Sequence, residues 1–175
     1  MSISVQVSRY DIGRQKIYKA ERLARKKLKK QFIRFRSIED CQRFCDMVTS
    51  SQIWQDLNAP SPIQIKAMRR IGRKRLFVRR RSLGLAKFKK ERDTGLIVFS
   101  HISLAPREIL KAISGGWDNF TILHELAHAA NPYQEKHGQK FVSAHLKLIG
   151  FHLGQEAENI FRQAYQRSGV NLPNI

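Results

Sequence analysis

No part of this 175-residue sequence limits the possible folds as strongly as the pentapeptide His124-Glu125-Leu126-Ala127-His128, which has the pattern His-Glu-x-x-His. A helix places residues i and i+4 on one face, so both imidazoles can reach a single metal ion. A chain of this composition would contain roughly 0.01 such matches by chance. Asp118 is a favourable N-cap before the pentapeptide, and Pro132 stops a helix soon after it. We therefore predict a metal-binding helix over residues 119–130.

The chemistry that this pattern favours is zinc-dependent hydrolysis. Zinc binds neutral imidazole nitrogen readily and is usually four-coordinate in proteins. Glu125 directly follows the first histidine, so it is placed to hold and deprotonate a water molecule whose pKa the metal lowers. Zn2+ is therefore the predicted cofactor, and Glu125 is the predicted general base.

A third protein ligand is needed, and the sequence offers several candidates. His137 ranks first, because the chain can turn at Pro132 and bring this residue back to the metal nine positions after His128. Gly138 permits close approach of the backbone at that point. The other candidate ligands are His145, Glu156 and Glu158. If His145 is not a ligand, we expect it in the core or as a hydrogen-bond partner of a ligand.

The chain carries a formal net charge of +19, and its basic residues are concentrated in two segments. Residues 14–36 contain 11 Lys and Arg with Glu21 as the one acid, and residues 66–92 contain 13 with Glu91 as the one acid. Most charged helix faces are simply solvated. So large an excess favours DNA or RNA as a partner, bound through phosphates without recognition of bases. The predicted phosphate contacts are Lys26, Lys27, Lys29, Lys30, Arg73, Arg75, Arg79, Arg80, Arg81, Lys87, Lys89 and Lys90.

Cysteine usage and hydrophobic patterning predict where the protein works. Cys41 and Cys45 are the only cysteines, which is too few for a disulfide framework or a four-cysteine zinc site. The two residues are one helical turn apart, and we expect them to pack in the core. The first residues lack the apolar stretch of a signal peptide, and no run of about 18 apolar residues occurs. We therefore expect a cytoplasmic protein with no membrane partner.

Residues 1–60 are predicted to form a basic, helical N-terminal region. Apolar residues recur every three or four positions between residues 14 and 36, which indicates an amphipathic helix whose apolar stripe extends to Phe32 and Phe35. A second helix is expected to begin after Ser37, because acidic residues and a new apolar stripe follow this potential N-cap.

Residues 61–175 are predicted to form a second domain that contains the pentapeptide. Short β-like runs predict a small, mostly antiparallel sheet over residues 62–100, with basic side chains along one face. Helical periodicity then predicts metal-binding helices over residues 106–168. The expected strands are 63–68, 75–79, 86–89 and 96–100, and the expected helices are 106–114, 119–130, 138–149 and 155–167, with Gly150 and Gly169 as C-caps. The predicted fold class is α+β.

The C-terminal part of the chain resembles a known family through two linked motifs. The run LHELAH, which contains residues 124–128, is followed eight residues later by HGQKF, residues 137–141. This pair is similar to the active site of SprT-like zinc metallopeptidases, in which a His-Gly-x-x-Phe element follows His-Glu-x-x-His. The chain looks closer still to a group of small, poorly characterised metallohydrolases of bacteria and their phages. Those proteins share the stretch Arg14-Gln-Lys-Ile-Tyr-Lys-Ala-Glu21.

The resemblance implies a zincin-like catalytic domain over residues 61–175, in a protein of a bacterial or phage-infected cell. The implied zinc ligands are His124, His128 and His137, and the implied general base is Glu125. The expected function is that of a zinc metalloprotease acting on proteins associated with nucleic acid, with an extended substrate paired along the sheet edge. One alternative is a nucleic-acid-binding structural protein of a phage particle or nucleoprotein assembly that retains a zinc site. Another is a hydrolase of amides other than proteins.

Overall fold

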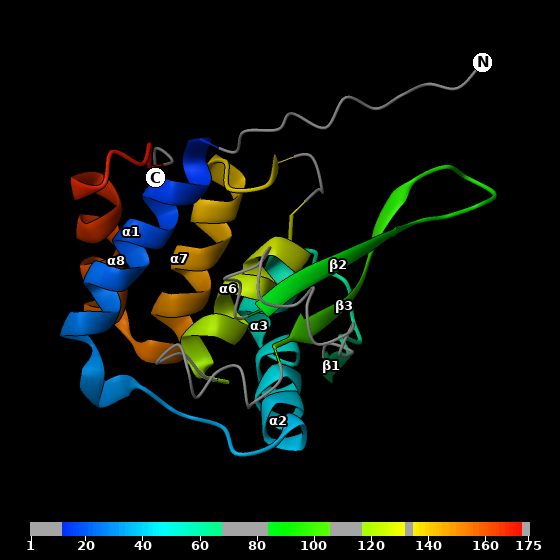
Figure 1. Ribbon diagram of the computed structural model, residues 1–175, viewed down its shortest axis with the longest axis horizontal. Helices are drawn as coiled ribbons and strands as arrows, with labels where there is room; N and C mark the ends of the chain where they lie inside the picture. The colour runs from blue at the N-terminus through cyan, green and yellow to red at the C-terminus, as the bar shows by residue number, and fades with distance from the viewer. Residues whose placement is uncertain (1–11, 68–83, 106–116, 132–134, 173–175) are drawn as a thin grey trace, which may run out of the picture.

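The computed structural model describes residues 12–67, 84–105, 117–131 and 135–172. These residues form helices and a small sheet, which confirms the α+β prediction (Figure 1). The helices are α1 (Ile12–Lys27), α2 (Ile38–Thr49), α3 (Gln52–Asp56), α6 (Asn119–Ala129), α7 (Gln139–Leu153) and α8 (Gln155–Arg167), with a 3-10 turn at Lys29–Gln31. The strands are β1 (Ile65–Ala67), β2 (Gly84–Lys90) and β3 (Ile97–Leu104). The predicted strand 75–79 and helix 106–114 lie outside the described residues.

The three strands form one sheet in the order β1-β3-β2. Along its whole length, from Gly84 to Lys90, β2 pairs antiparallel with β3, with a register shift between Lys87 and Phe88. On its other side β3 pairs with β1 over three positions, and this pairing is parallel. The prediction of a mostly antiparallel sheet therefore agrees with the long pairing. It does not say which strand is parallel, because residue patterns within a strand do not specify the direction of its partner.

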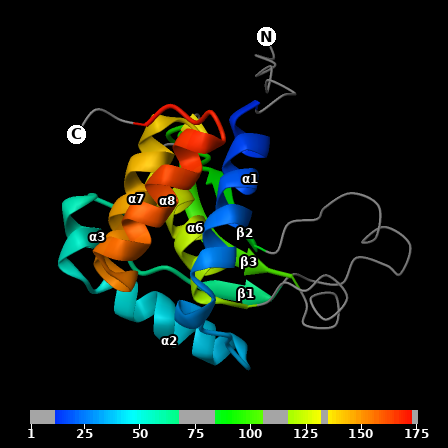
Figure 2. The same cartoon turned by 90° about the vertical axis from the view of Figure 1, so that its left-hand side faces the viewer.

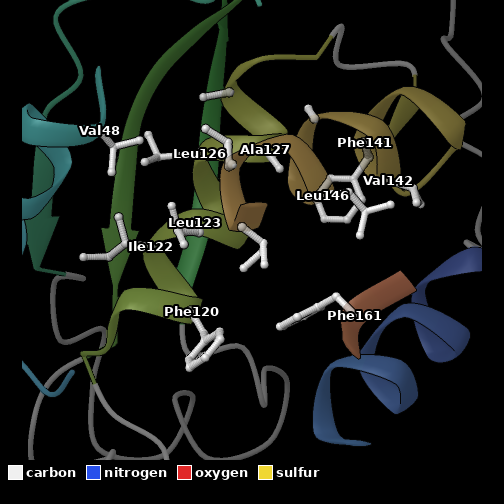
Figure 3. Packing of buried hydrophobic residues seen from close by; sticks show 14 of the residues in the cluster. Val48, Phe120, Ile122, Leu123, Leu126, Ala127, Phe141, Val142, Leu146 and Phe161 are labelled. Atoms are coloured by element: carbon white, nitrogen blue, oxygen red, sulfur yellow. The ribbon is translucent and has the colours of Figure 1, made fainter. Parts of the chain in front are cut away.

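Helix α6 lies at the centre of the molecule, between α7 and the sheet (Figures 1 and 2). Ten of its eleven residues are buried, so it is a core helix and not a surface one. Phe120 meets Phe161 of α8 at 5.8 Å between ring centroids, and Leu126 is directed toward Val48 of α2 (Figure 3). The buried cluster includes residues of α1, α2, the sheet, α6, α7 and α8. The two regions predicted from sequence thus share one core.

The N-terminal amphipathic helix is shorter than its periodicity predicts. Helix α1 ends at Lys27, and the segment after the 3-10 turn runs beside the start of α6. The Phe35 N–H donates to the Trp117 carbonyl at 2.7 Å, and the Asn119 N–H donates to the Ile33 carbonyl at 3.1 Å. These bonds between distant segments replace the helical bonds that the periodicity predicts. Both phenylalanines of the predicted stripe still pack against the core.

Helix α2 begins after Ser37, as predicted. Ser37 Oγ accepts a hydrogen bond from the Asp40 N–H at 3.0 Å, and Asp40 Oδ2 accepts one from the Ser37 N–H at 3.1 Å, which completes a capping box. Cys41 and Cys45 are fully buried on its inner face. Burial raises the pKa of each thiol to about 12. The prediction that both cysteines pack in the core is confirmed.

Helix α7 continues past its predicted end at Gly150. It ends at Leu153, and Gly154 follows with φ at +90°. Gly150 instead lies inside α7, where a Cβ atom would collide with the carboxylate of Glu158 in α8. Gly150 thus leaves room for the Glu158 side chain, and the predicted C-cap role is wrong. Gly169, with φ at +71°, follows α8 where the sequence predicts a cap. None of the described helices is long and apolar enough to cross a membrane.

Candidate metal centre

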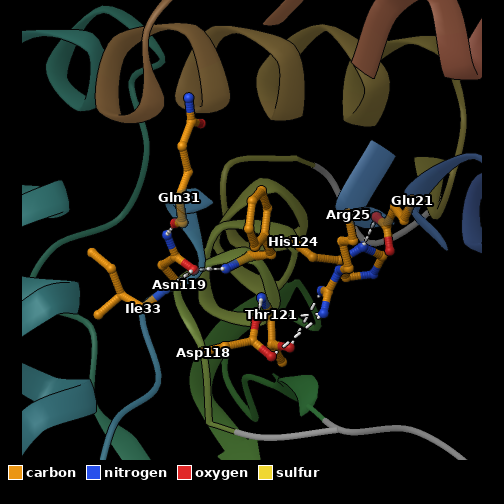
Figure 4. Close-up of polar contacts among 9 residues, drawn as sticks. Glu21, Arg25, Gln31, Ile33, Asp118, Asn119, Thr121 and His124 are labelled. Atoms are coloured by element: carbon orange, nitrogen blue, oxygen red, sulfur yellow. Dashed lines mark hydrogen bonds and ion pairs between the residues drawn. The ribbon is translucent and has the colours of Figure 1, made fainter. Parts of the chain in front are cut away.

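Helix α6 carries the pentapeptide and is fixed at its N-terminus by a cap and by contacts with α1. Asp118 Oδ1 accepts a hydrogen bond from the Thr121 N–H at 2.7 Å, so the predicted cap is confirmed. Arg25 of α1 lies 3.4 Å from both Asp118 oxygens and 3.4 Å from Thr121 Oγ1 (Figure 4). Asn119 Nδ2 donates to the Gln31 carbonyl at 2.9 Å. These contacts fix α6 relative to α1, and both helices supply residues to the site.

The structure brings the three predicted histidine ligands together. One ring nitrogen from each of His124, His128 and His137 lies within 4.8 Å of the others. The first is buried and the other two are partly buried. A tetrahedral zinc ion about 2.1 Å from each nitrogen holds its nitrogens about 3.4 Å apart, so small side-chain rotations are enough to complete the geometry. The donor set therefore fits one metal ion, and zinc is among the transition metals that imidazole suits.

Aromatic side chains hold these three rings in place. Phe141 of the HGQKF motif lies 5.0 Å from His124, 4.5 Å from His128 and 5.0 Å from His137, measured between ring centroids. Tyr18 of α1 stacks on His124 at 5.6 Å and meets His137 edge-on at 5.7 Å. Contacts of this kind restrict ring rotation, so the three histidines are largely held in the arrangement that a metal ion would need.

The protonation state of the α6 histidines suits metal binding. Burial lowers the pKa of His124 and of His128 well below the usual value, and neighbouring imidazoles lower both further. Both rings are therefore neutral at physiological pH. Because metal ligands have to be unprotonated, no proton needs to leave these rings before a nitrogen lone pair binds the ion.

Glu125 extends from the same helix toward the sheet. It is 5% exposed, and its Oε2 accepts a hydrogen bond from the Ala86 N–H of β2 at 2.6 Å. Gly84 of the same strand makes room for it, since a Cβ atom there would lie 2.8 Å from Glu125 Cγ and 2.9 Å from Oε1. Burial raises the pKa of Glu125 to about 8, although the Ala86 N–H acts in the opposite direction. A carboxyl with a pKa near neutrality can accept and return a proton.

One carboxylate at the site was not assigned a role from the sequence. Glu21 of α1 is 6% exposed, and its Oε1 lies 2.5 Å from His124 Nδ1. The charge pattern contains the signal that could have identified it. Glu21 is the one acid among the basic residues 14–36, and it lies four positions after Ile17, on the apolar stripe of α1. A lone acid on the buried face of a cationic helix indicates a specific partner in the core. The sequence analysis also assigned no role to Tyr18, which contacts His124 and His137.

The alternative third ligands lie outside the group of three histidines. His145 is buried nearby, but its Nδ1 lies 2.5 Å from Tyr165 Oη and 4.0 Å from Glu21 Oε1. Its burial, at 1% exposed, agrees with the expectation of a core position. The acidic alternatives, Glu156 and Glu158, belong to the first turn of α8. The described residues therefore favour the ligand that the spacing ranked first.

The predicted phosphate contacts are only partly described. Outside the described residues lie Arg73, Arg75, Arg79, Arg80 and Arg81. Four other predicted contacts have exposed side chains: Lys26 and Lys27 at the end of α1, and Lys29 and Lys30 in the 3-10 turn. The last three predicted contacts lie in β2, where Lys89 and Lys90 are exposed and Lys87 is partly buried. Cations in the last turn of a helix also interact favourably with the helix dipole, so those of α1 have a structural use besides any partner.

Comparisons with known proteins assign no family to the chain. No family model matches it, and no match was found among curated proteins or solved structures. The likeness to SprT-like metallopeptidases therefore stays a prediction that rests chiefly on the motifs of residues 124–141.

Proposed function

We propose that this protein is a zinc-dependent hydrolase of peptide bonds. The observation that carries the proposal is the group formed by His124, His128 and His137, here called the metal group. Its three imidazole nitrogens lie within 4.8 Å of one another, on and beside the helix that also carries the buried Glu125. Structural zinc sites are closed by four protein ligands, whereas catalytic sites have three and keep a position for water or substrate. Within the described residues the group has three members, which supports a catalytic site.

Glu125 supplies the proton transfer that hydrolysis needs. Zinc held by the three histidines would act as a Lewis acid toward the substrate carbonyl and toward water. Because Glu125 Oε2 is held by the Ala86 N–H, Oε1 is the atom that takes a proton from the attacking water. Water oxygen adds to the carbonyl carbon, the amide C–N bond breaks, and the proton held by Glu125 leaves with the amine.

The position of β2 supports an extended peptide as substrate. In the order β1-β3-β2 it is the outer strand of the described sheet. The Ala86 N–H of this strand is directed at Glu125, so the strand borders the proposed general base, which follows His124 in α6. A peptide that pairs with such an edge gains main-chain hydrogen bonds and lies beside the catalytic groups. A metal-binding helix next to an edge strand is also what a zincin-like fold requires.

The exposed lysines near the end of α1 support a substrate associated with nucleic acid. Residues 22–36 contain eight Lys and Arg and no acid. Lys26, Lys27, Lys29 and Lys30 are all exposed, and phosphate is the common anion that such a cluster binds without sequence preference. A protein already bound to DNA or RNA would be brought to the metal group by this contact.

The substitution Glu125→Gln tests the proposed function. The amide cannot accept the proton of the attacking water, yet it keeps nearly the same shape and is not a ligand. We expect zinc content and circular dichroism to be unchanged and cleavage of casein to fall by about 100-fold or more. Glu156→Gln, the same change at an exposed position of α8, is the matched control and should keep wild-type activity.

Assays with and without duplex DNA separate the alternatives. Wild-type protein that binds zinc and DNA but cleaves neither casein nor a DNA-bound protein would contradict the proposal and favour the structural nucleic-acid-binding protein. Glu125→Gln activity within a few fold of wild type would remove Glu125 as the general base.

A further inference from the structure

The proposed hydrolysis assigns no role to Glu21, the buried carboxylate of α1. Its Oε1 lies 2.5 Å from His124 Nδ1, and the side chain is almost closed to water (Figure 4). A buried carboxylate is costly unless a hydrogen-bond donor accompanies it. A His124 ring that carries its proton on Nδ1 would supply such a donor, and His124 is the first of the three histidines of the candidate metal site.

This contact determines which nitrogen of His124 is available to a metal. A neutral imidazole carries a single proton, so Nε2 keeps its lone pair when Nδ1 donates to Glu21. The His124 ring lies 4.9 Å from the His128 ring and 5.5 Å from the His137 ring, measured between centroids. With Nδ1 engaged by the carboxylate, Nε2 is the atom that this ring can offer to the shared ion.

Residues of other helices surround Glu21. On α7, His145 Nδ1 lies 4.0 Å from Glu21 Oε1, and on α8 Tyr165 Oη lies 2.5 Å from that nitrogen. Both side chains are at most 1% exposed. One turn further along α1, Arg25 binds Asp118 and so ties α1 to the start of α6. The carboxylate therefore lies beside His124 of α6 and His145 of α7, in a buried position where α1, α6, α7 and α8 pack together.

We propose that Glu21 is a positioning residue of the metal site, which fixes the tautomer and orientation of His124 through Nδ1. The inference rests on the metal site of the proposed function and is independent of hydrolysis, so zinc alone serves as the probe. A carboxylate that accepts a hydrogen bond from a ligand histidine orients the ring and makes it a stronger base. Loss of such a partner typically weakens metal binding by about 10- to 100-fold.

The first test compares zinc dissociation constants of full-length proteins, measured by competition with a chromophoric chelator. Glu21→Gln removes the charge and keeps the shape, and we expect it to bind zinc about 10- to 100-fold more weakly than wild type. Asp118→Asn is the matched control. Asp118 is also a buried carboxyl that joins α1 to α6, but it contacts no ligand histidine, and asparagine still caps a helix. This control should bind zinc as wild type does, whereas equal affinity in Glu21→Gln would overturn the proposal.

A second readout needs no variant. Nitrogen-15 NMR of metal-free wild-type protein near neutral pH reports which ring nitrogen of His124 carries the proton. We expect the proton on Nδ1, and a proton on Nε2 would overturn the positioning role whatever the variants do. Wild-type protein with no affinity for zinc would contradict the proposed function itself. Zinc affinity that does not depend on Glu21 would contradict only the inference drawn here.

Discussion

The role proposed for Glu125 depends on a glycine in the neighbouring strand. A Cβ atom at Gly84 would lie within 3.1 Å of three atoms of the Glu125 side chain. Glu125 is buried under β2 and held by the Ala86 N–H, so it has little freedom to move aside. Any side chain at position 84 therefore has to displace the carboxylate.

We expect Gly84→Ala to lower kcat/KM by up to about 100-fold, because misplacement of a catalytic group by about 1 Å can have an effect of that size. Zinc content should not change, since the collision involves Glu125 and none of the histidines. The matched control is Gly150→Ala in α7, where the new Cβ meets a different glutamate, Glu158, and where activity should persist. Wild-type kcat/KM in Gly84→Ala would show that the proposed base tolerates displacement.

At the scale of elements, helix α1 has two faces with different uses. Its inner face places Tyr18 and Glu21 against the metal group, and Arg25 against the start of α6. Its outer face and the 3-10 turn that follows expose lysines to solvent. One helix thus links the predicted polyanion contact to the residues around the three histidines.

Replacement of Lys29 and Lys30 by Gln tests whether this element binds phosphates. We expect the slope of log affinity against log salt for duplex DNA to flatten by up to about 0.9 for each phosphate that the variant no longer neutralises, with zinc content unchanged. Lys147→Gln with Arg167→Gln removes the same charge from exposed positions of α7 and α8 and should leave the slope nearly intact. Fluorescence polarisation at several salt concentrations measures both. Equal flattening in the two variants would assign the binding to net charge and not to this segment.

Local signals predicted the helices better than they predicted helix ends and strand partners. Ser37 and Asp118 marked the starts of α2 and α6 correctly, because a cap acts within four residues of itself. The end of α1 was not predictable in this way. Ile33 leaves the helical pattern to bond Asn119, 86 positions away, and such a partner leaves no trace in local periodicity. Gly150 was mistaken for a cap for the same reason, since its neighbour belongs to another helix.

At the scale of the whole molecule, the parts of the site that depend on residues close together in the sequence were predictable, and those that depend on distant residues were not. The structure groups His124, His128 and His137 as the sequence predicts, because these residues are close together in the chain. Glu21 lies 103 positions before His124, so only the assembled core brings them together. The family resemblance, the identity of the metal and the nucleic-acid partner stay predictions.

The stability of the molecule at alkaline pH should depend on its two cysteines. Burial raises the pKa of Cys41 and Cys45 from about 9 to about 12, so above pH 9 the unfolded chain releases protons that the folded chain keeps. The contribution of the two protonated thiols to the free energy of unfolding is therefore complete below pH 9. It is lost as the pH rises toward 12, by up to about 1.4 kcal/mol per pH unit for each thiol. A variant with both cysteines changed to Ala should lose stability less steeply when urea unfolding is compared on both sides of pH 9. Parallel curves would contradict this expectation.

Because these two sulfur atoms are buried, the rate at which they are labelled reports how often the core opens. Thiol reagents attack the thiolate, and neither sulfur is accessible while α2 is packed against the core. Labelling by a chromogenic disulfide must therefore wait until that packing opens. Because a ligand that binds only the folded state makes opening rarer, bound zinc should slow the labelling of sulfurs that do not touch it. The unmodified chain can thus register occupancy of the proposed metal site through the rate at which its thiols react.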